Sequence, residues 1–177
     1  MTRNRYIKDY RLVEYVNERG RIRTDCEYIG PAYRFERDAR TVRRAKKLLT
    51  VVCVVGWLTF VSALIPDSQG MCTLYVALPF TFAALPLGML TEIAITAAPA
   101  KEPLERRHAD KLNNRYPPTA MAVSVLTALG LAGELVCLLR GTMLKAGDLW
   151  FSFCALLLLV CGVAAFARRG LLAARED

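Results

Sequence analysis

Long apolar segments alternate with shorter charged ones along most of the chain. A charged helical pattern from Glu36 to Lys47, without any Gly or Pro, passes into eighteen uncharged residues from Leu48 to Ile65. Roughly 20 helical residues cover the hydrocarbon core of a bilayer, which is about 30 Å thick. The pattern therefore predicts a helix that begins in charged sequence and continues as a membrane span.

Three further segments have the same apolar character. They cover 72–98, 120–139 and 149–167. Helices satisfy their own backbone polar groups, which makes them the usual structures for carrying such segments across lipid. The four segments together predict an all-α membrane fold, a bundle of four transmembrane helices over 36–177.

Prolines and polar residues modify this pattern in the middle of the chain. The segment over 72–98 is long for one crossing and contains Pro79 and Pro86. Each proline removes a backbone hydrogen bond, so we expect tilt or a kink there. The polar stretch over 99–119 is expected to be a cytosolic loop, helical at most between residues 103 and 113.

Residues 1–35 follow a different, strand-like pattern. Polar and apolar residues alternate strictly over 21–28, the period of a strand with one buried face, and Tyr10–Val16 is a second candidate strand. Turn-forming residues at 17–20 lie between them, and a short third strand is expected over 32–35. We predict a small cytosolic arm, a β-hairpin or three-stranded meander.

The apolar face of this arm needs a surface to cover it. Two or three short strands are only marginally stable alone. The candidates are the charged helix over 36–47, the membrane surface, a second copy of the chain or another protein. The apolar side chains concerned are Leu12 or Val13, Ile22, Tyr28 and Phe35.

The distribution of cations indicates the orientation. If both termini are cytosolic, 22 of the 24 Lys and Arg residues lie on the cytosolic side, and only Arg140 and Lys145 lie outside. Cations that flank a span favour the cytosol. We therefore expect an integral protein of the plasma membrane with both termini in the cytosol, and with Tyr116, Trp150 and Phe151 as anchors at the membrane interfaces.

Two ionisable residues lie inside the predicted spans, Glu92 and Glu134. An intramembrane carboxylate suggests a functional site, and small or polar residues on one helix face mark contacts between helices. Each glutamate has such neighbours at helical spacing, so we expect both to face the bundle interior. These neighbours are Thr81, Gly88 and Thr96 for Glu92, and Thr127 and Gly130 for Glu134.

The two glutamates are not expected to form a pair. At 1.5 Å per residue, Glu92 lies about 9 Å from the inner end of its span and Glu134 about 8 Å from the outer end of its own. Across a core of about 30 Å, the two differ in height by more than about 10 Å. Each carboxylate either bonds its own helix or reaches its own interface, or the two are stations on a path for protons or cations.

A basic cluster precedes the first span. Its cations either attract anionic lipid, at about 1 kcal/mol for each charge, or serve only as the orientation signal. Acidic residues interleave with the basic ones in the arm and no recognised motif occurs, so we expect no nucleic-acid partner. The candidate lipid contacts are Arg37, Arg40, Arg43, Arg44, Lys46 and Lys47.

Sequence signatures of enzymes and metal sites are missing. The chain contains no nucleophile elbow, phosphate-binding loop, dinucleotide fingerprint or zinc-protease motif. The six cysteines lack zinc-ligand spacing and His108 is the only histidine, so we expect neither a metal nor a cofactor. We expect a non-catalytic assembly, scaffold or accessory subunit that forms homo- or hetero-oligomers through its spans or its arm. The alternative is an oligomeric transporter or channel for protons or cations that uses Glu92 and Glu134.

Overall fold

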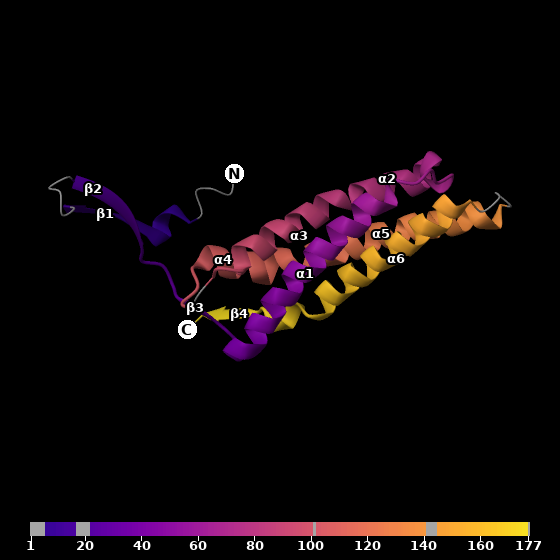
Figure 1. Cartoon of the computed structure of the whole chain (residues 1–177). Helices are drawn as coiled ribbons and strands as arrows, with labels where there is room; N and C mark the ends of the chain where they lie inside the picture. Colours follow the sequence, from indigo (N-terminus) through magenta and orange to yellow (C-terminus); the bar gives the residue numbers. More distant parts are fainter. Residues whose placement is uncertain (1–5, 17–21, 101, 141–144, 177) are drawn as a thin grey trace.

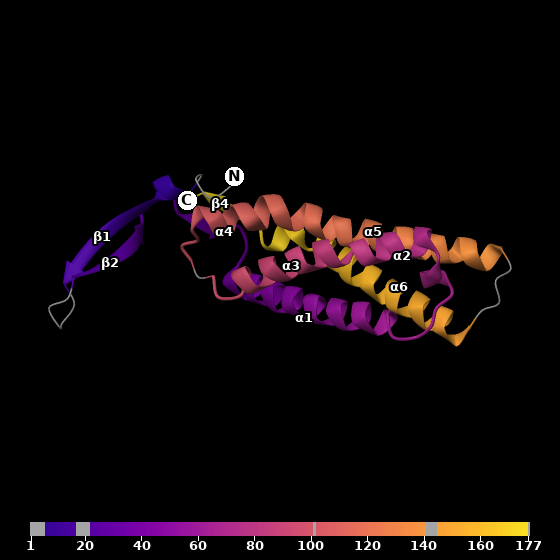
Figure 2. The ribbon, with the colours of Figure 1, turned by 90° about the horizontal axis from the view of Figure 1, so that it is seen from above.

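The computed structural model of the protein describes residues 6–16, 22–100, 102–140 and 145–176. These residues form an elongated helical bundle, from one end of which a β-hairpin projects (Figure 1). We call this end, where the C-terminal strand also lies, the arm end, and the opposite one the far end; Figure 2 shows both from above. Among the described residues, four helical segments are long and apolar enough to cross a membrane.

The first long helix, α1 (Ala39–Ala63), joins charged and apolar sequence without a break, as the sequence predicts. Its 25 residues extend over about 37 Å, which exceeds the thickness of a hydrocarbon core. Its buried side chains recur every three or four residues, so one face of the helix packs against the bundle. They include Val42, Ala45, Leu49, Val52, Phe60 and Ala63.

The second apolar segment forms two helices with a one-residue break between them, in the region where its prolines predict tilt or a kink. Helix α2 (Leu74–Phe82) is followed by α3 (Ala84–Ala97) after one intervening residue. Pro79 and Pro86 lack the N–H groups that would continue the hydrogen-bond ladder. The backbone N–H of Ala83 still donates to the Pro79 carbonyl over 3.1 Å, so the chain direction is maintained across the break.

The polar stretch over 99–119 is helical from Arg106 onwards, within the range expected up to residue 113 and beyond it up to residue 119, where a loop was expected. Helix α4 (Arg106–Asp110) continues through a π-helical turn, η3 (Lys111–Arg115), into α5 (Tyr116–Leu139). Two prolines occupy the first turn of α5, where their missing N–H groups are tolerated. The π turn directly before them joins α4 to the long apolar helix α5.

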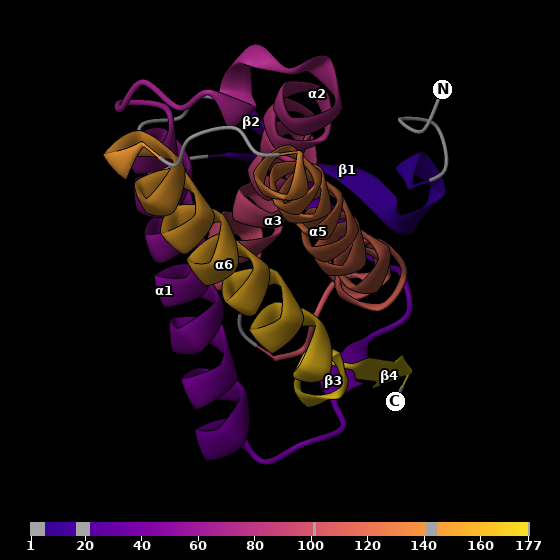
Figure 3. The ribbon, with the colours of Figure 1, turned by 90° about the vertical axis from the view of Figure 1, so that its right-hand side faces the viewer.

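The last long helix is α6 (Ala146–Ala167). The chain then runs along the arm end through η4 (Arg169–Leu171) and strand β4 (Ala174–Glu176). Viewed from the far end, α1 packs against α6 and α3, while α5 packs against α6, α2 and α3 (Figure 3). In the far half, rings from three of the helices meet in the core, and they belong to Phe60, Phe80 and Phe151.

The predicted hairpin is confirmed, whereas the three-stranded meander is wrong. Strand β1 (Tyr10–Val16), preceded by the short helix η1 (Ile7–Asp9), pairs antiparallel with β2 (Ile22–Tyr28). The expected third strand forms as β3 (Tyr33–Phe35), but it pairs with β4 instead of β2. The expected turn at 17–20 lies outside the described residues.

Strand β3 pairs with β4 because the bundle returns the C-terminal segment to the arm end. On its other side, Tyr33 and Leu104 exchange two backbone hydrogen bonds, of 3.0 and 2.8 Å. Leu104, Ala109 and Ala174 form a small buried cluster, against which Tyr33 and Phe35 pack. The apolar side chains of β3 are therefore covered by the end of the bundle and not by the hairpin.

Candidate functional site

Tyrosine hydroxyl groups attach the base of the hairpin to the start of α4. Tyr10 Oη donates a hydrogen bond to Glu105 Oε2 over 2.6 Å. Tyr28 Oη accepts one from the backbone N–H of Arg106 (2.9 Å) and donates one to the carbonyl of Pro31 (2.8 Å). The two tyrosine rings pack edge to face with their centroids 5.3 Å apart. These contacts fix the base of the hairpin relative to the bundle.

The same contacts change the acidity of both tyrosines. Burial raises the pKa of Tyr10 to about 12, and the hydrogen bond to Glu105 adds to the rise because an ionised Tyr10 could not donate it. Burial also raises the pKa of Tyr28, while the N–H of Arg106 acts in the opposite direction. Both hydroxyl groups are therefore protonated at neutral pH.

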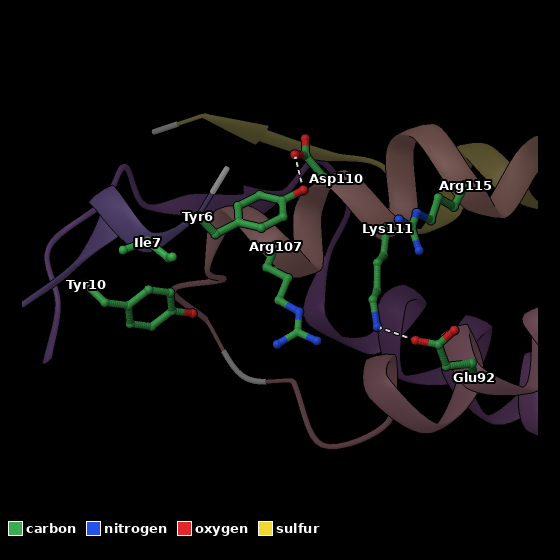
Figure 4. Close-up of a pocket in the computed structure, with 8 residues that line it drawn as sticks. All are labelled: Tyr6, Ile7, Tyr10, Glu92, Arg107, Asp110, Lys111 and Arg115. Carbon is green, nitrogen blue, oxygen red and sulfur yellow. Dashed lines mark hydrogen bonds and ion pairs between the residues drawn. The ribbon is translucent and has the colours of Figure 1, made fainter. Parts of the chain in front are cut away.

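A pocket of about 560 Å³, open to the surface on one side, lies between this arm and the bundle (Figure 4). Its basic wall comes from α4 and η3, on which three cationic residues follow one another at intervals of four. Figure 4 shows Arg107 and Lys111 extending in the same direction, between Tyr10 and Glu92. The lining residues are Tyr6, Ile7, Tyr10, Glu92, Arg107, Asp110, Lys111 and Arg115.

Both carboxylates of the pocket are engaged. Tyr6 Oη donates to Asp110 Oδ2 over 2.7 Å. Lys111 Nζ forms an ion pair with Glu92 Oε1, also over 2.7 Å. Each carboxylate therefore receives its hydrogen bond from a residue other than the two arginines of the wall.

Arg107 and Arg115 can reach a ligand, although the positive charge of each also attracts the Glu92 carboxylate. Both side chains are exposed, and neither forms an ion pair with another residue in the described part of the chain. A guanidinium group presents several N–H donors in a planar fork that matches the oxygens of carboxylates and phosphates. The pocket can therefore bind an anion.

Glu92 lines this pocket, and the expectation that it faces the bundle interior is wrong. Its side chain is 57% exposed, because α3 buries the other side of the helix. Of its predicted neighbours, Thr81 is exposed, a Cβ atom added to Gly88 would meet nothing within 4 Å, and Thr96 donates to the carbonyl of Glu92 over 3.0 Å. The buried positions of α3 include Leu87, Leu90, Ile93, Ala94 and Ala97.

Glu134 faces the bundle interior, as predicted, and lies near the far end. Its carboxylate contacts Gly70, in the short helix η2 (Gly70–Cys72) that precedes α2. Any side chain at position 70 would collide with that carboxylate. The Oε2 atom of Glu134 is buried and has no hydrogen-bond partner in the described part of the chain. Glu92 and Glu134 thus lie near opposite ends of the bundle, so they do not form a pair.

The predicted companions of Glu134 also face the interior. Thr127 is buried, and its hydroxyl donates to the carbonyl of Val123 over 2.8 Å. A Cβ atom added to Gly130 would lie 3.4 Å from the Cβ atom of Phe80, so the glycine lets α2 approach α5 closely. The stripe on α5 is therefore a contact surface between helices.

Asp148 is a buried carboxylate that the sequence analysis missed. Its Oδ1 atom accepts hydrogen bonds from Ser68 Oγ (2.8 Å) and Gln69 N–H (2.7 Å), and its Oδ2 atom accepts one from Lys145 N–H (3.1 Å). It thereby ties the connection before α2 to the start of α6. Asp148 thus makes one half of a capping box, but Lys145 has no side-chain acceptor for the other half, so the sequence lacks the usual signature.

The basic cluster before the first span is mostly exposed, with one exception. Lys46 Nζ donates to the carbonyl of Ala100 over 2.6 Å and lies 4.9 Å from the ring centroid of Phe35. Lys46 therefore links α1 to the structure of the arm end. The exposed members are Arg37, Arg40, Arg43, Arg44 and Lys47.

Two of the three expected interfacial anchors are wrong. Tyr116 is buried and donates to the carbonyl of Ala165 over 2.6 Å, and Phe151 is fully buried in the aromatic core. Trp150 is exposed, and its Nε1–H donates to the Ser62 carbonyl over 3.1 Å. The position of an aromatic residue near the end of a predicted span therefore does not show whether its side chain lies at an interface or in the core.

The basic wall of the pocket was also missed, although Arg107, Lys111 and Arg115 stand at intervals of four in the sequence. In the described part of the chain, no group of three His, Cys, Asp or Glu side chains could hold a metal ion.

No protein-family model matches the chain, and no curated protein or solved structure matches it at a significant level.

Proposed function

We propose that the protein is a non-catalytic multi-pass protein of the plasma membrane that assembles with a second copy of itself through its hairpin. Membrane insertion is supported by the apolar side chains on the outward faces of the four long helical segments. A soluble monomer rarely exposes a continuous apolar surface of this extent. These side chains include Val51, Val54, Leu58, Val61, Leu78, Phe82, Leu85, Val125, Leu129, Leu156, Val160 and Val163.

The proposed orientation places the arm end in the cytosol. The exposed basic residues at the start of α1, the basic wall of the pocket and the C-terminal strand all belong to that end. At the far end the sequence places only two basic residues, Arg140 and Lys145. This asymmetry agrees with the preference of flanking cations for the cytosol.

The hairpin carries the proposal of assembly. Beyond its base it projects away from the bundle (Figures 1 and 2), and its strands β1 and β2 pair with no third strand in the described residues. On the face that continues from Tyr10 and Tyr28, Leu12 is 69% and Ile22 70% exposed. Unpaired strand edges beside an exposed apolar face are sites at which further strands add.

The pattern of β2 fits pairing with a second copy of β2. If the strands pair antiparallel about Thr24, Ile22 lies opposite Cys26, and the apolar face continues across the new sheet. The same register places position 23, an arginine, opposite Asp25. Opposite charges at facing positions stabilise such pairs. The edge of β1 is less suitable, because pairing about Val13 would place Leu12 opposite Glu14.

The first prediction tests this assembly. We expect the protein purified in mild detergent to have the protein mass of a dimer or higher oligomer. The substitution Ile22→Glu places a charge in the proposed interface and should shift the mass to that of the monomer. The matched control is Glu27→Ser, which alters an exposed residue of the same strand on its other face and should leave the oligomer intact. A monomeric wild-type protein, or an unchanged Ile22→Glu oligomer, would contradict self-assembly.

The second candidate function, transport of protons or cations, is favoured by Glu134 alone. A buried carboxylate oxygen without a hydrogen-bond partner is costly unless it binds a proton or another cation. Glu92 does not belong to this path, because it lies at the surface of the arm end. The alternative predicts that Glu134→Gln abolishes proton- or cation-dependent flux into liposomes while Glu92→Gln leaves the flux intact. Equal flux in the wild-type protein and both variants would reject it.

A further inference from the structure

The pocket between the arm and the bundle lies at the level that phospholipid headgroups would occupy if the protein spans a bilayer as proposed. Glu92, on its wall, belongs to the last part of α3, and Arg107 and Lys111 precede the third crossing. This placement rests on the proposed membrane insertion, whereas the charge and shape of the pocket do not.

The basic wall supplies the chemistry for a phosphate group. Arg107, Lys111 and Arg115 stand at intervals of four, so their side chains follow one face of the α4–η3 segment. The two arginines have no ion-pair partner in the described part of the chain, so a ligand would not have to break an existing pair to reach them. Bidentate hydrogen bonds from guanidinium groups are among the strongest contacts that proteins make with phosphate.

The tyrosine side of the pocket limits what else can bind. The hydroxyl groups of Tyr6 and Tyr10 donate to Asp110 and Glu105, so they are not available to a ligand. These contacts engage the carboxylates of Asp110 and Glu105 with tyrosine donors. A volume of about 560 Å³ exceeds the needs of an isolated phosphate and is in the range of small-molecule sites, so it leaves room for an esterified group.

The outer surface of α3 offers a place for acyl chains. Leu85 and Met89 lie seven and three residues before Glu92, on the same side of the helix and towards the far end. Both are exposed apolar side chains. A phospholipid with its phosphate in the pocket would therefore extend its chains along an apolar surface, in the direction of the proposed membrane core.

We propose that this pocket binds the phosphate ester of an anionic phospholipid from the cytosolic leaflet. Arg107 and Arg115 are the primary ligands, and Lys111 exchanges its ion pair with Glu92 for the phosphate. Glu92 then opposes binding, since its carboxylate competes for Lys111 and repels the anion. This assignment is distinct from nonspecific attraction by the basic cluster at the start of α1.

The test measures binding to purified protein in neutral detergent by calorimetry, with phosphatidic acid, phosphatidylcholine and inorganic phosphate as separate probes. We expect phosphatidic acid to bind at least about tenfold more tightly than either of the others. The double substitution Arg107→Gln/Arg115→Gln should weaken that binding at least about tenfold. The matched control, Arg37→Gln/Arg40→Gln, removes two exposed arginines of the same membrane face and should change it less than about twofold. Glu92→Gln should strengthen it, an effect that a misfolded variant would not show.

Each contrary result has a separate meaning. Equal affinity for inorganic phosphate and phosphatidic acid would overturn the lipid source of the phosphate. Equal losses in the pocket variant and the α1 control, or no loss in either, would overturn the pocket as the site. Alkali extraction of the cell membranes, before detergent is added, tests membrane insertion separately. A protein that stays in the alkali-washed membrane but, once purified, does not bind phosphatidic acid would reject this inference alone.

Discussion

Tyr10 helps to attach the hairpin to the bundle. Its hydroxyl group joins the first strand to Glu105, directly before α4, and its ring packs against Tyr28. An intramolecular hydrogen bond contributes about 1 kcal/mol to the stability of a folded protein. The bond exists only while the hydroxyl is protonated, so its contribution depends on pH.

The pKa of Tyr10 in the folded protein, about 12, lies above its ordinary value of 10.0. The docked state therefore favours the protonated form, and the stabilisation it provides is complete below a pH of about 10 and is lost as the pH rises through about 12. We expect the ultraviolet titration of tyrosinate in the wild-type protein, minus that of Tyr10→Phe, to show a group with a midpoint near 12. A difference curve centred near 10 would show that the hairpin is not docked.

The two predicted intramembrane glutamates differ because of their neighbours across the bundle. Glycines on α5 let α2 approach closely, and Glu134 is enclosed against Gly70 as a result. Glu92 has no such partner helix, and Lys111 holds it at the surface. The two glutamates have similar small or polar neighbours at helical spacing in the sequence. Whether each glutamate is buried therefore depends on the helix that faces it, which the local pattern does not specify.

The π turn η3 and strand β4 form a connected unit at the scale of structural elements. The side chain of Asn113 binds both backbone polar groups of Ala174: its Nδ2 donates to the carbonyl over 2.7 Å, and its Oδ1 accepts from the N–H over 3.0 Å. Strand β4 then pairs with β3, so one side chain of the helical segment positions a two-stranded sheet.

We expect Asn113→Ala to release β4, because the variant loses two hydrogen bonds that contribute about 1 kcal/mol each. Hydrogen exchange should become faster at residues 33–35 and 174–176 while the long helices keep their protection. Asn114→Ala is the matched control, since it alters the next, exposed residue of the same turn. Equal exchange in the two variants would contradict the proposed role of Asn113.

Elements defined by local patterns could be predicted, and those defined by distant partners could not. Period-two alternation was sufficient for β2, with Tyr10–Val16 as a second candidate strand, and uncharged length was sufficient for the four long apolar helical segments. The partner of β3 is the C-terminal strand, which no local signal indicates. The pocket was missed for the same reason, since its walls come from the arm, α3 and the α4–η3 segment.

At the scale of the whole molecule, the arm end and the far end have different chemical character. The arm end carries the hairpin, the basic pocket and the exposed arginines of α1. The far end carries the aromatic core and the buried carboxylates of Glu134 and Asp148. Between them the helices present apolar side chains to their surroundings. This division is what a bilayer with a basic cytosolic face would require.

The most direct test of this account is the labelling of two native cysteines by a membrane-impermeant maleimide. Cys26 is exposed on the hairpin and Cys72 is exposed at the far end, so the proposed orientation places them on opposite sides of the membrane. Cys26→Ser and Cys72→Ser variants assign each label. In intact cells we expect Cys72 to react and Cys26 to react only after the membrane is opened. Labelling of Cys26 in intact cells, or a protein that stays dissolved without detergent, would contradict the central claim.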